Sequence, residues 1–268
     1  MPEGDTIFRT ATSLRRWLTG RRVTEATSSV GGIDARRLID RRVEGVNALG
    51  KHLLIHFSGD LVVHSHMRMT GSWHVYPTGE RWRRPAGQAR LVLEAGARSA
   101  ICFNAPVVEL LAARDVARHP VLRRLGPDLL VPGAADRFVG ARARARVRAS
   151  PTVGELLLDQ QVMAGIGNLY RCETLFLCAL DPWTPSLAVS DGTLDELMGT
   201  ASRLMAANAT AGNGIRRFDG PAGLTWVYRR GGLTCRRCGT VVARAMLGRQ
   251  ARSLYWCPGC QPTSAAGR

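Results

Sequence analysis

Four cysteines near the end of the chain constrain its fold more than any other feature. They form two pairs with 18 residues between them, Cys235-x-x-Cys238 and Cys257-x-x-Cys260. Two tight turns of this kind can present four thiolates at the corners of a tetrahedron, which is the usual arrangement for structural zinc. Two disulfides or an iron–sulfur cluster are the alternatives, and disulfides are rare inside cells.

The cysteine pattern therefore predicts one Zn²⁺ ion on a short ribbon, with strands near residues 241–243 and 253–256. Four thiolates leave no open coordination position, so the metal is expected to stabilise the fold and to take no part in chemistry. The other three cysteines lie in apolar surroundings and are expected in the core: Cys102, Cys172 and Cys178.

The spacing of hydrophobic residues divides the rest of the chain into helical and strand regions. Residues 5–18 carry apolar side chains at helical spacing, with Asp5 as the expected N-cap. From about residue 22 to 111 the period is two, and a Ser-Gly-Asp turn separates predicted strands at 52–57 and 61–66.

Helical patterns replace the strands from about residue 112 to 212, with helices expected over 152–163, after a Gly-rich turn, and over 192–209. The order predicts an α+β protein with an N-terminal helix and two-layer β-sandwich at 1–116. A helical domain at 117–222 and a zinc ribbon at 223–268 follow.

The formal net charge of +16 limits the classes of partner that the protein can be expected to bind. A charge of this size on one chain is usually kept for a polyanion, so nucleic acid is favoured over an anionic membrane surface or a ribosomal role. No apolar run reaches the roughly 18–20 residues that span a bilayer, and the start lacks a signal pattern. We expect a cytoplasmic protein without a membrane partner.

Lys51 is the only lysine among 37 Lys and Arg residues. A coding preference for arginine explains most of this bias, and a lysine should survive it where arginine does not serve. Lysine is a compact charge that can lose its proton when crowded, whereas arginine cannot. Lys51 is therefore the first candidate for a catalytic residue, although one lysine can also survive by chance.

Four motifs occur in order along the chain: Met1-Pro2-Glu3-Gly4-Asp5-Thr6, Gly50-Lys51-His52, Gly165-Ile166-Gly167-Asn168 and the segment from Arg252 to Gln261. Together they resemble the formamidopyrimidine-DNA glycosylase and endonuclease VIII family over nearly the full length. The resemblance implies that the helical domain is a helix–two-turn–helix domain. It also implies a monomeric bacterial DNA glycosylase and AP lyase, whose partner is double-stranded DNA with a damaged base or an abasic site.

The residues at the start make chemical sense of this activity. If Met1 is removed, Pro2 presents a secondary amine, and an α-amine with a pKa of about 8 is partly neutral at pH 7. Such an amine can attack the sugar C1′ and form an iminium. Glu3 can protonate the opening sugar ring or shuttle protons during elimination, or it can simply favour the following helix N-terminus. Lys51 is expected to protonate the departing base or to assist at the sugar.

The resemblance also implies residues that hold DNA. Asn168 opens a helix after a Gly-rich turn, where free backbone amides can bind phosphate, although it could be an ordinary N-cap. Arg252 is expected to grip phosphates beside the lesion and to support the second elimination. Arg124 matches a DNA contact of the family less closely.

An enzyme that acts on a base must take it from the stack and fill the void. Met69 occupies the position of the family's void-filling residue, and a core methionine is the alternative. His64 and His66 are interpreted as strand residues rather than ligands.

The start of the chain looks like endonuclease VIII, which prefers oxidised pyrimidines. The purine-directed branch carries an Arg-Phe pair after Asn-x-Pro, and here Val107-Val108-Glu109 follows Asn104-Ala105-Pro106. Arg68 also stands where endonuclease VIII often has glutamine. An oxidised-purine glycosylase, a mainly abasic-site lyase and a non-catalytic zinc-ribbon DNA-binding protein remain as alternatives.

Overall fold

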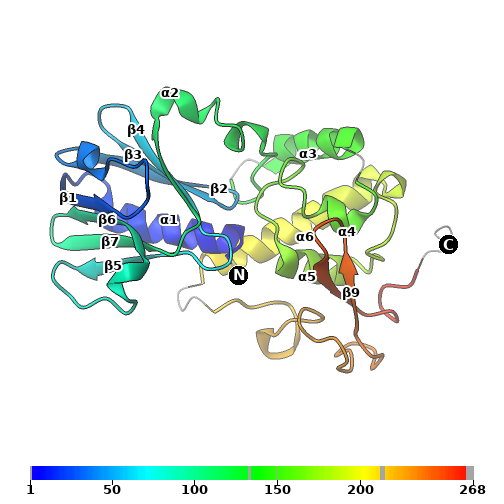
Figure 1. Ribbon diagram of the computed structural model, residues 1–268. Helices are drawn as coiled ribbons and strands as arrows, with labels where there is room; N and C mark the ends of the chain where they lie inside the picture. Colours follow the sequence, from blue (N-terminus) through cyan, green and yellow to red (C-terminus); the bar gives the residue numbers. More distant parts are fainter. Residues whose placement is uncertain (1, 132–133, 149, 212–214, 264–268) are drawn as a thin grey trace. The chain divides into compact units, whose positions relative to one another are not determined.

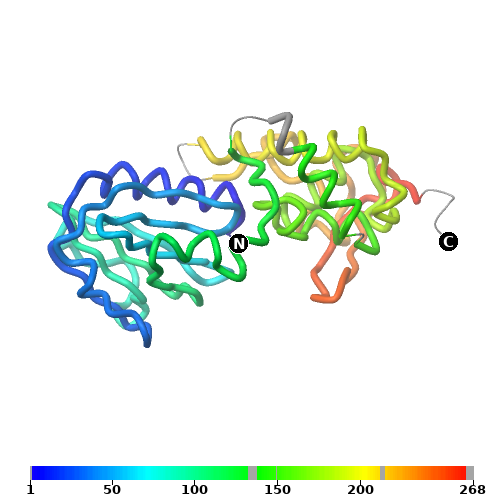
Figure 2. Tube along the Cα trace, turned by 90° about the horizontal axis from the view of Figure 1, so that it is seen from above, coloured from blue at the N-terminus to red at the C-terminus, as the bar shows by residue number. Residues whose placement is uncertain are grey.

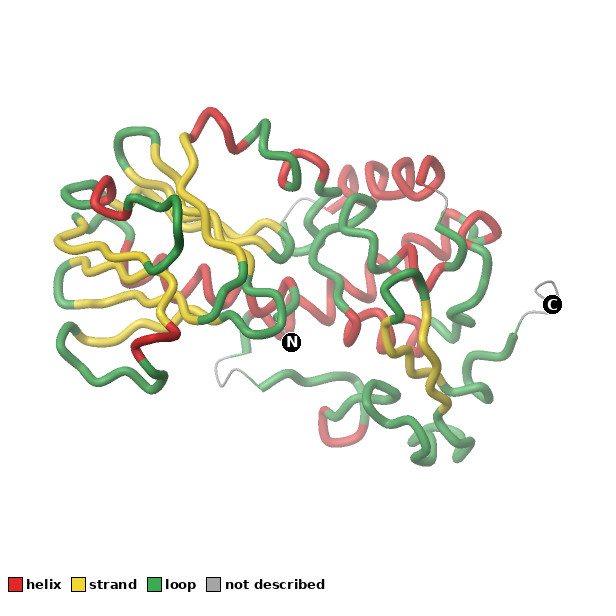
Figure 3. The backbone as a smooth tube through the Cα atoms, in the orientation of Figure 1, coloured by secondary structure: helices red, strands yellow, loops and turns green. Residues whose placement is uncertain are grey.

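The computed structural model describes residues 2–131, 134–148, 150–211 and 215–263. It divides into two compact units, Met1–Arg124 (unit 1) and Leu125–Arg268 (unit 2). Figure 1 colours the chain along its sequence and labels many of its helices and strands. Strands dominate the first unit and helices the second, as Figure 3 shows. The boundaries of the three predicted domains remain predictions.

Within residues 2–124, unit 1 consists of one long helix, eight strands and short helical turns. The elements are α1 (Gly4–Leu18), β1 (Val23–Ser28), β2 (Val43–Leu49), β3 (His52–Phe57), β4 (Leu61–His66), β5 (Ser72–Pro77), β6 (Ala89–Ala95), β7 (Arg98–Phe103), β8 (Val107–Ala112) and α2 (Ala113–Val116). All pairings are antiparallel, and they form two four-stranded sheets with the orders β1-β6-β7-β5 and β2-β3-β4-β8. The predicted strands 52–57 and 61–66 are confirmed at both ends.

One hydrophobic core joins α1 to both sheets. It includes Ile7 and Leu14 from α1, Ile55 from β3 and Leu93 from β6, all at most 1% exposed. Alternate residues of each strand face this core, which is why the sequence has a period of two there. The predicted helix with a two-layer β-sandwich is confirmed.

The start of α1 differs from the expectation. Asp5 lies inside the first turn with its side chain fully buried, and Glu3 is the N-cap residue. The carbonyl oxygen of Glu3 accepts hydrogen bonds from the backbone N–H groups of Thr6 (2.9 Å) and Ile7 (3.2 Å). The prediction of Asp5 as the cap was wrong, because this carboxylate packs inward, where Arg9 lies 3.9 Å away.

Unit 2 contains four helices and a two-stranded ribbon among its described residues. They are α3 (Ala134–Arg148), α4 (Val153–Leu156), α5 (Asn168–Leu177), α6 (Asp191–Ala209), β9 (Ala243–Leu247) and β10 (Arg252–Trp256). Helix α5 is buried on all sides, since every residue from Asn168 to Phe176 is buried. Leu169 and Leu175 belong to a core shared with α6, while Cys172 and Phe176 belong to the core of the ribbon. The helix thus connects the helical and ribbon parts of this unit.

The predicted helix over 152–163 was wrong in length, because α4 ends at Leu156. The Oδ1 atom of Asp159 accepts a hydrogen bond from the backbone N–H of Gln161 (2.9 Å), and the Gln160 amide donates to the carbonyls of Leu158 and Ile166, both at 2.9 Å. These side chains compete with helical hydrogen bonds and favour turns.

The first ribbon strand also lies later than expected. Val241 forms an isolated bridge with Thr234, and β9 starts at Ala243 and pairs with β10 as far as Leu247. Val242 donates from its N–H to the carbonyl of Leu233 (2.9 Å) and accepts from the N–H of Gly232 (2.8 Å), so these two positions pair with the segment before Cys235 and the longer pairing begins only beyond them. The second strand agrees with its prediction within one residue. None of the described helices has the length and apolar character that crossing a membrane requires.

Candidate functional site

The predicted catalytic residues of unit 1 belong to the start of α1 and to the turn between β2 and β3. Gly50 and Lys51 form a two-residue hairpin turn, in which Leu49 pairs with His52. Gly50 has a φ of 56°, a left-handed conformation that suits glycine in the first position of such a turn. Lys51 is half-buried, as is Pro2, while Glu3 is fully buried.

Helix α1 runs antiparallel to β2. The Arg15 guanidinium donates to the carbonyl oxygen of Val46 from Nε (3.1 Å) and Nη2 (2.6 Å), which fixes one point of contact. From Arg15 back to Gly4 the helix rises about 16 Å. From Val46 forward to Lys51 an extended chain also covers about 16 Å. The start of α1 therefore lies near the β2–β3 turn, and Figures 1 and 2 both show these two segments at the same end of unit 1.

Met69 lies on the loop between β4 and β5 and is 59% exposed. This exposure excludes the alternative that it is a core methionine, a place that Met67 takes with 2% exposure. The loop is tightly held, because a Cβ at Gly71 would lie 2.7 Å from the carbonyl oxygen of Met67 and 2.9 Å from the Cα of Ala105. Met69 is thus presented to solvent by a loop with a fixed base.

A hydrogen-bonded group of histidines near Lys51 was missed by the sequence interpretation. His64 and His66 are strand residues, as expected, but His64 also bonds to His52 (Nε2 to Nδ1, 2.8 Å) and to Glu109 (Nδ1 to Oε2, 2.7 Å). The partners come from β3, β4 and β8, so only the sheet register brings them together. A polar residue at alternate positions of an otherwise apolar strand was the available signal.

Burial keeps these histidines neutral. It is the main cause that lowers the pKa of His52 to about 2 and the pKa of His66 to about 4, and the charge of Lys51 lowers both further. Burial also lowers the pKa of His64, while the hydrogen bond and charge of Glu109 oppose this change. The two imidazoles on which the charge of Lys51 acts, those of His52 and His66, therefore add no positive charge at neutral pH.

In unit 2, Asn168 opens α5 but does not cap it. Gly167 is the N-cap residue, and the Asn168 amide donates from Nδ2 to the carbonyl oxygen of Ser253 on β10 (2.7 Å). Its Oδ1 accepts a bond from the buried Arg171 guanidinium (2.5 Å), which also donates to Ser253 (3.2 Å). The N-cap alternative is excluded, and Asn168 instead attaches the ribbon to α5.

Arg252 lies next to that attachment, at the start of β10. Its exposed guanidinium donates from Nε (3.2 Å) and Nη2 (3.0 Å) to Oε1 of Gln250, on the same hairpin. Arg124 lies at the end of unit 1 and is also exposed. Exposed guanidinium groups such as these are suited to phosphate oxygens.

Glu173 is a second residue that the sequence interpretation missed. Its carboxylate is fully buried and accepts hydrogen bonds from three consecutive backbone N–H groups, those of Trp226 (2.7 Å), Val227 (3.0 Å) and Tyr228 (2.8 Å). Burial raises the pKa of this carboxyl group against the effect of these bonds. Glu173 thereby fixes the segment that leads into the ribbon.

The four predicted metal ligands come together. Their sulfur atoms all lie within 4.8 Å of one another, with Cys238 and Cys257 3.4 Å apart and Cys235 and Cys260 3.9 Å apart. The Cys257 N–H donates to the side chain of Gln261 (3.0 Å), whose amide donates to the carbonyl of Leu180 (2.9 Å). The four thiols form a site that can hold a metal ion.

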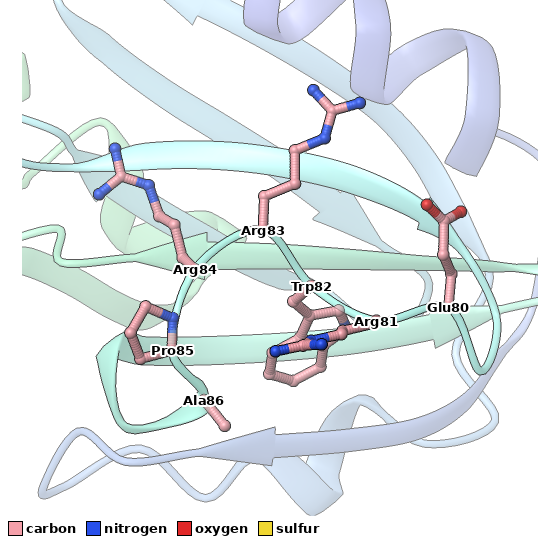
Figure 4. Close-up of a pocket in the computed structure, with 7 residues that line it drawn as sticks. All are labelled: Glu80, Arg81, Trp82, Arg83, Arg84, Pro85 and Ala86. Atoms are coloured by element: carbon pink, nitrogen blue, oxygen red, sulfur yellow. The ribbon is translucent and has the colours of Figure 1, made fainter.

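An open hollow beside the β5–β6 loop is shown in Figure 4. It is lined by residues 80–86, which include three arginines and Trp82, and none of the predicted site residues lines it. Trp82 packs edge-on against Phe103, with ring centroids 5.8 Å apart. The hollow is formed by one loop and is separate from the predicted site.

Two family models match the chain in sequence. The formamidopyrimidine-DNA glycosylase N-terminal domain matches residues 1–106, and the formamidopyrimidine-DNA glycosylase H2TH domain matches residues 125–219. These matches cover most of the chain, so it belongs to the formamidopyrimidine-DNA glycosylase and endonuclease VIII family. The resemblance inferred from four short motifs is confirmed.

Curated relatives agree over nearly the full length. The probable endonuclease 8 2 of Streptomyces coelicolor is 39% identical over 267 residues, which cover 97% of this chain and 94% of that protein. The endonuclease 8 2 of Mycobacterium tuberculosis is 39% identical, with 97% and 100% covered. An endonuclease 8 of Escherichia coli is 32% identical with the same coverage.

Solved structures share the fold. Lactococcus lactis formamidopyrimidine-DNA glycosylase, non-covalently bound to DNA with an abasic site, gives a TM-score of 0.80 at 18% identity. A complex of the same enzyme with DNA that contains an oxidised pyrimidine gives 0.83 at 18% identity. Each comparison covers 98% of this chain and 100% of the other.

Proposed function

We propose that this protein is a bifunctional DNA glycosylase and AP lyase, acting on double-stranded DNA with a damaged base or an abasic site. The observation that carries the proposal is the convergence of the start of α1 with the β2–β3 turn. This brings an N-terminal imino group, a buried carboxylate and the only lysine of the chain into one neighbourhood. The endonuclease 8 relatives, at 32–39% identity over nearly the whole chain, support the same activity.

In this mechanism the nitrogen of Pro2 attacks the sugar C1′, and the bond from C1′ to the base breaks. The departing base takes a proton from Lys51, and Glu3 protonates the ring oxygen as the sugar opens. The resulting iminium makes the C2′ proton acidic, so that β-elimination cleaves the strand on one side of the sugar. A second elimination, supported by Arg252, cleaves the other side.

Recognition of DNA in this proposal depends on exposed cations and backbone amides. Asn168 and Arg252 hold phosphates near the lesion through α5 and the ribbon, and Arg124 adds a contact from unit 1. Met69 enters the duplex where the damaged base leaves the stack. The exposure of Met69, Arg124 and Arg252 supports these roles.

One structural Zn²⁺ ion is proposed for the site of Cys235, Cys238, Cys257 and Cys260. The sulfur spacing and the two tight turns fit tetrahedral coordination by four thiolates. When bound, the metal would hold the two turns of the ribbon together and supply no reactive group. The residues of the ribbon would then present Arg252 at a fixed place.

Oxidised pyrimidines are the proposed substrate class, because the start of the chain looks like endonuclease VIII and the Arg-Phe pair of the purine branch is missing. A panel of duplexes, each with a single lesion, tests this choice by the base released. Release of formamidopyrimidine or 8-oxoguanine alone would favour the purine-directed alternative. Cleavage of abasic sites without base release would favour the lyase alternative.

Borohydride reduction with abasic-site DNA tests the enzyme itself. We expect a covalent adduct on the peptide that starts with Pro2, from protein whose initiator methionine has been removed. A protein that binds DNA but gives no adduct would be the zinc-ribbon DNA-binding alternative. Strand cleavage by protein that keeps Met1 would exclude Pro2 as the nucleophile.

A further inference from the structure

Three residues of one sheet form a continuous buried chain of hydrogen bonds, here called the His52–His64–Glu109 chain. His52 Nδ1 lies 2.8 Å from His64 Nε2, and His64 Nδ1 lies 2.7 Å from Glu109 Oε2. His52 and His64 are 7% and 1% exposed, while the Glu109 side chain is 40% exposed. The chain therefore leads from the neighbour of Lys51 to a carboxylate at the surface.

The direction of these hydrogen bonds follows from His119, the second partner of Glu109. His119 Nδ1 accepts the backbone N–H groups of Val121 (3.3 Å) and Leu122 (3.2 Å), so in the neutral ring the proton is on Nε2. That Nε2 donates to Glu109 Oε2 (3.1 Å). Glu109, as a carboxylate, is an acceptor only.

Because Glu109 accepts, His64 donates from Nδ1, and its Nε2 must be the acceptor for the N–H of His52 Nδ1. The remaining nitrogen of His52, Nε2, then carries a lone pair. This is the logic by which a buried carboxylate fixes the tautomer of a catalytic histidine, extended here by one imidazole.

Binding of a metal ion is the alternative role for these residues, since His64, Glu109 and His119 offer ligand atoms within 4.8 Å of one another. Coordination through His119 Nε2 would move its proton to Nδ1, where Val121 and Leu122 already present two N–H donors. Three donors would then face one another, so the surroundings of His119 favour the hydrogen-bonded chain.

The inner end of the chain lies at Lys51. His52 follows Lys51 directly and pairs across β3 and β4 with His66, at a ring centroid distance of 4.5 Å. The positive charge of Lys51 acts on both rings. A neutral His52 adds no positive charge beside this ammonium group, and the lone pair on its Nε2 makes that nitrogen an acceptor rather than a donor.

We propose that Glu109, acting through His64, fixes His52 as a neutral imidazole with its lone pair on Nε2 and thereby sets the surroundings of Lys51 for base excision. This inference rests on the proposed function. His52, His64 and Glu109 are positioning residues in it, and Lys51 remains the group that meets the substrate. Without the chain, the tautomer of His52 would not be fixed, and Nε2 would carry the proton in one of its two tautomers.

The test compares His64→Phe with the wild-type protein, because phenylalanine keeps the ring and removes both hydrogen bonds. Excision of an oxidised pyrimidine, in single turnover with saturating DNA, is expected to fall about 10- to 100-fold, as for other residues that orient a catalytic group. Cleavage of abasic-site DNA should change less than about threefold, because it does not need Lys51 to protonate a base. His74→Phe is the control, since His74 is a half-buried histidine of β5, in the other sheet, that bonds to Tyr76 (2.9 Å) and packs edge-on against Phe103.

Unchanged excision in His64→Phe, or an equal loss in His74→Phe, would overturn the inference. Abasic-site cleavage by the same samples shows whether the variant is folded and whether Pro2 works. A wild-type protein without a borohydride adduct would instead refute the proposed function, so the two failures are distinguishable.

Glu109→Gln supplies a second test by its pH profile, because glutamine can accept the same bonds without the charge. The titratable groups that face His64 are His52 on β3, Glu109 on β8, His119 after α2 and His66 on its own strand. The charges of Lys51 and Arg68 act on His66. Among these groups, only Glu109 raises the pKa of His64.

Protonation of His64 at Nε2 breaks its bond to His52, so excision by the wild-type protein should fall at acidic pH. Loss of the Glu109 charge lowers the pKa of His64, and this fall should move to lower pH in Glu109→Gln. An acid limb that does not move would contradict the chain. Metal analysis completes the test: one zinc per wild-type chain is expected, and a second ion lost in Glu109→Gln would overturn the proposal in favour of a metal site.

Discussion

Replacing Asn168 by alanine should weaken the attachment of the ribbon to α5, and with it the binding of DNA by unit 2. The change removes the bond from Nδ2 to Ser253 (2.7 Å) and the acceptor of the buried Arg171 guanidinium (2.5 Å). A neutral hydrogen bond contributes about 1 kcal/mol and one to a charged group about 2 kcal/mol. Arg171 keeps its bond to Ser253 (3.2 Å).

The sum is a loss of about 3 kcal/mol in the free energy of unfolding of unit 2. For a unit of this size it lowers Tm by about 6–12 °C. The same change releases the start of β10, where Arg252 lies, so affinity for an abasic-site duplex should fall more than about tenfold. Calorimetry of the zinc-loaded protein and a titration at constant salt measure the two effects.

Two further variants test whether the affinity loss comes from the contacts of Asn168 rather than from lower stability alone. Asn168→Asp keeps an acceptor for Arg171 but loses the donor to Ser253, so it should bind DNA weakly with a smaller loss of stability. Asn208→Ala removes other buried bonds of unit 2, from Nδ2 to Leu204 (3.0 Å) and to Arg217 (2.9 Å). It should lower Tm and leave DNA affinity unchanged. Equal affinity losses in Asn168→Ala and Asn208→Ala would refute the reasoning.

Three other changes have distinct expected results. Lys51→Arg should retain DNA affinity and lose base excision much more than abasic-site cleavage, because the charge survives and the geometry changes. Equal losses in the two single-turnover rates would contradict the role of Lys51. Cys257→Ser should lower zinc content and DNA affinity together, as metal analysis and titration would show, and intact binding by the zinc-free variant would count against the ribbon. Met69→Ala should change stability by less than about 0.5 kcal/mol, because the side chain is exposed, but slow excision from a duplex relative to a mismatched site. Equal rates on the two substrates would argue that Met69 does not fill the void.

The parts of the fold that follow from local chemistry could be predicted. The strands on either side of Ser58-Gly59-Asp60 were correct to the residue, because the turn and the alternation beside it depend on neighbours in sequence. The helix expected over 152–163 failed because Asp159 and Gln160 use their side chains to close turns, which hydrophobic period does not register.

Candidate site residues could be named from motifs, but their contacts could not. The bond between Asn168 and Ser253 joins residues 85 positions apart, and the one between His64 and Glu109 joins residues 45 apart. Such bonds depend on strand register and on the packing of α5 against β10. A period of two indicates only which face a residue occupies, so His64 was interpreted as a strand residue and its partners were missed.

The two sets of proposed site residues are held by different physical means. In unit 1 the start of α1 and the β2–β3 turn are fixed by the antiparallel packing of a helix on a strand, with Arg15 bonded to Val46 at its far end. In unit 2 the ribbon packs on α5 through a small apolar core, and polar contacts of Asn168 attach it there, while Glu173 fixes the segment that leads into it. Loss of a polar contact in unit 2 should therefore weaken binding of DNA and leave the reactivity of Pro2 at saturating DNA intact. A change around Lys51 should instead leave DNA affinity intact and lower base excision, because that neighbourhood keeps its packing when a single charge or tautomer is altered.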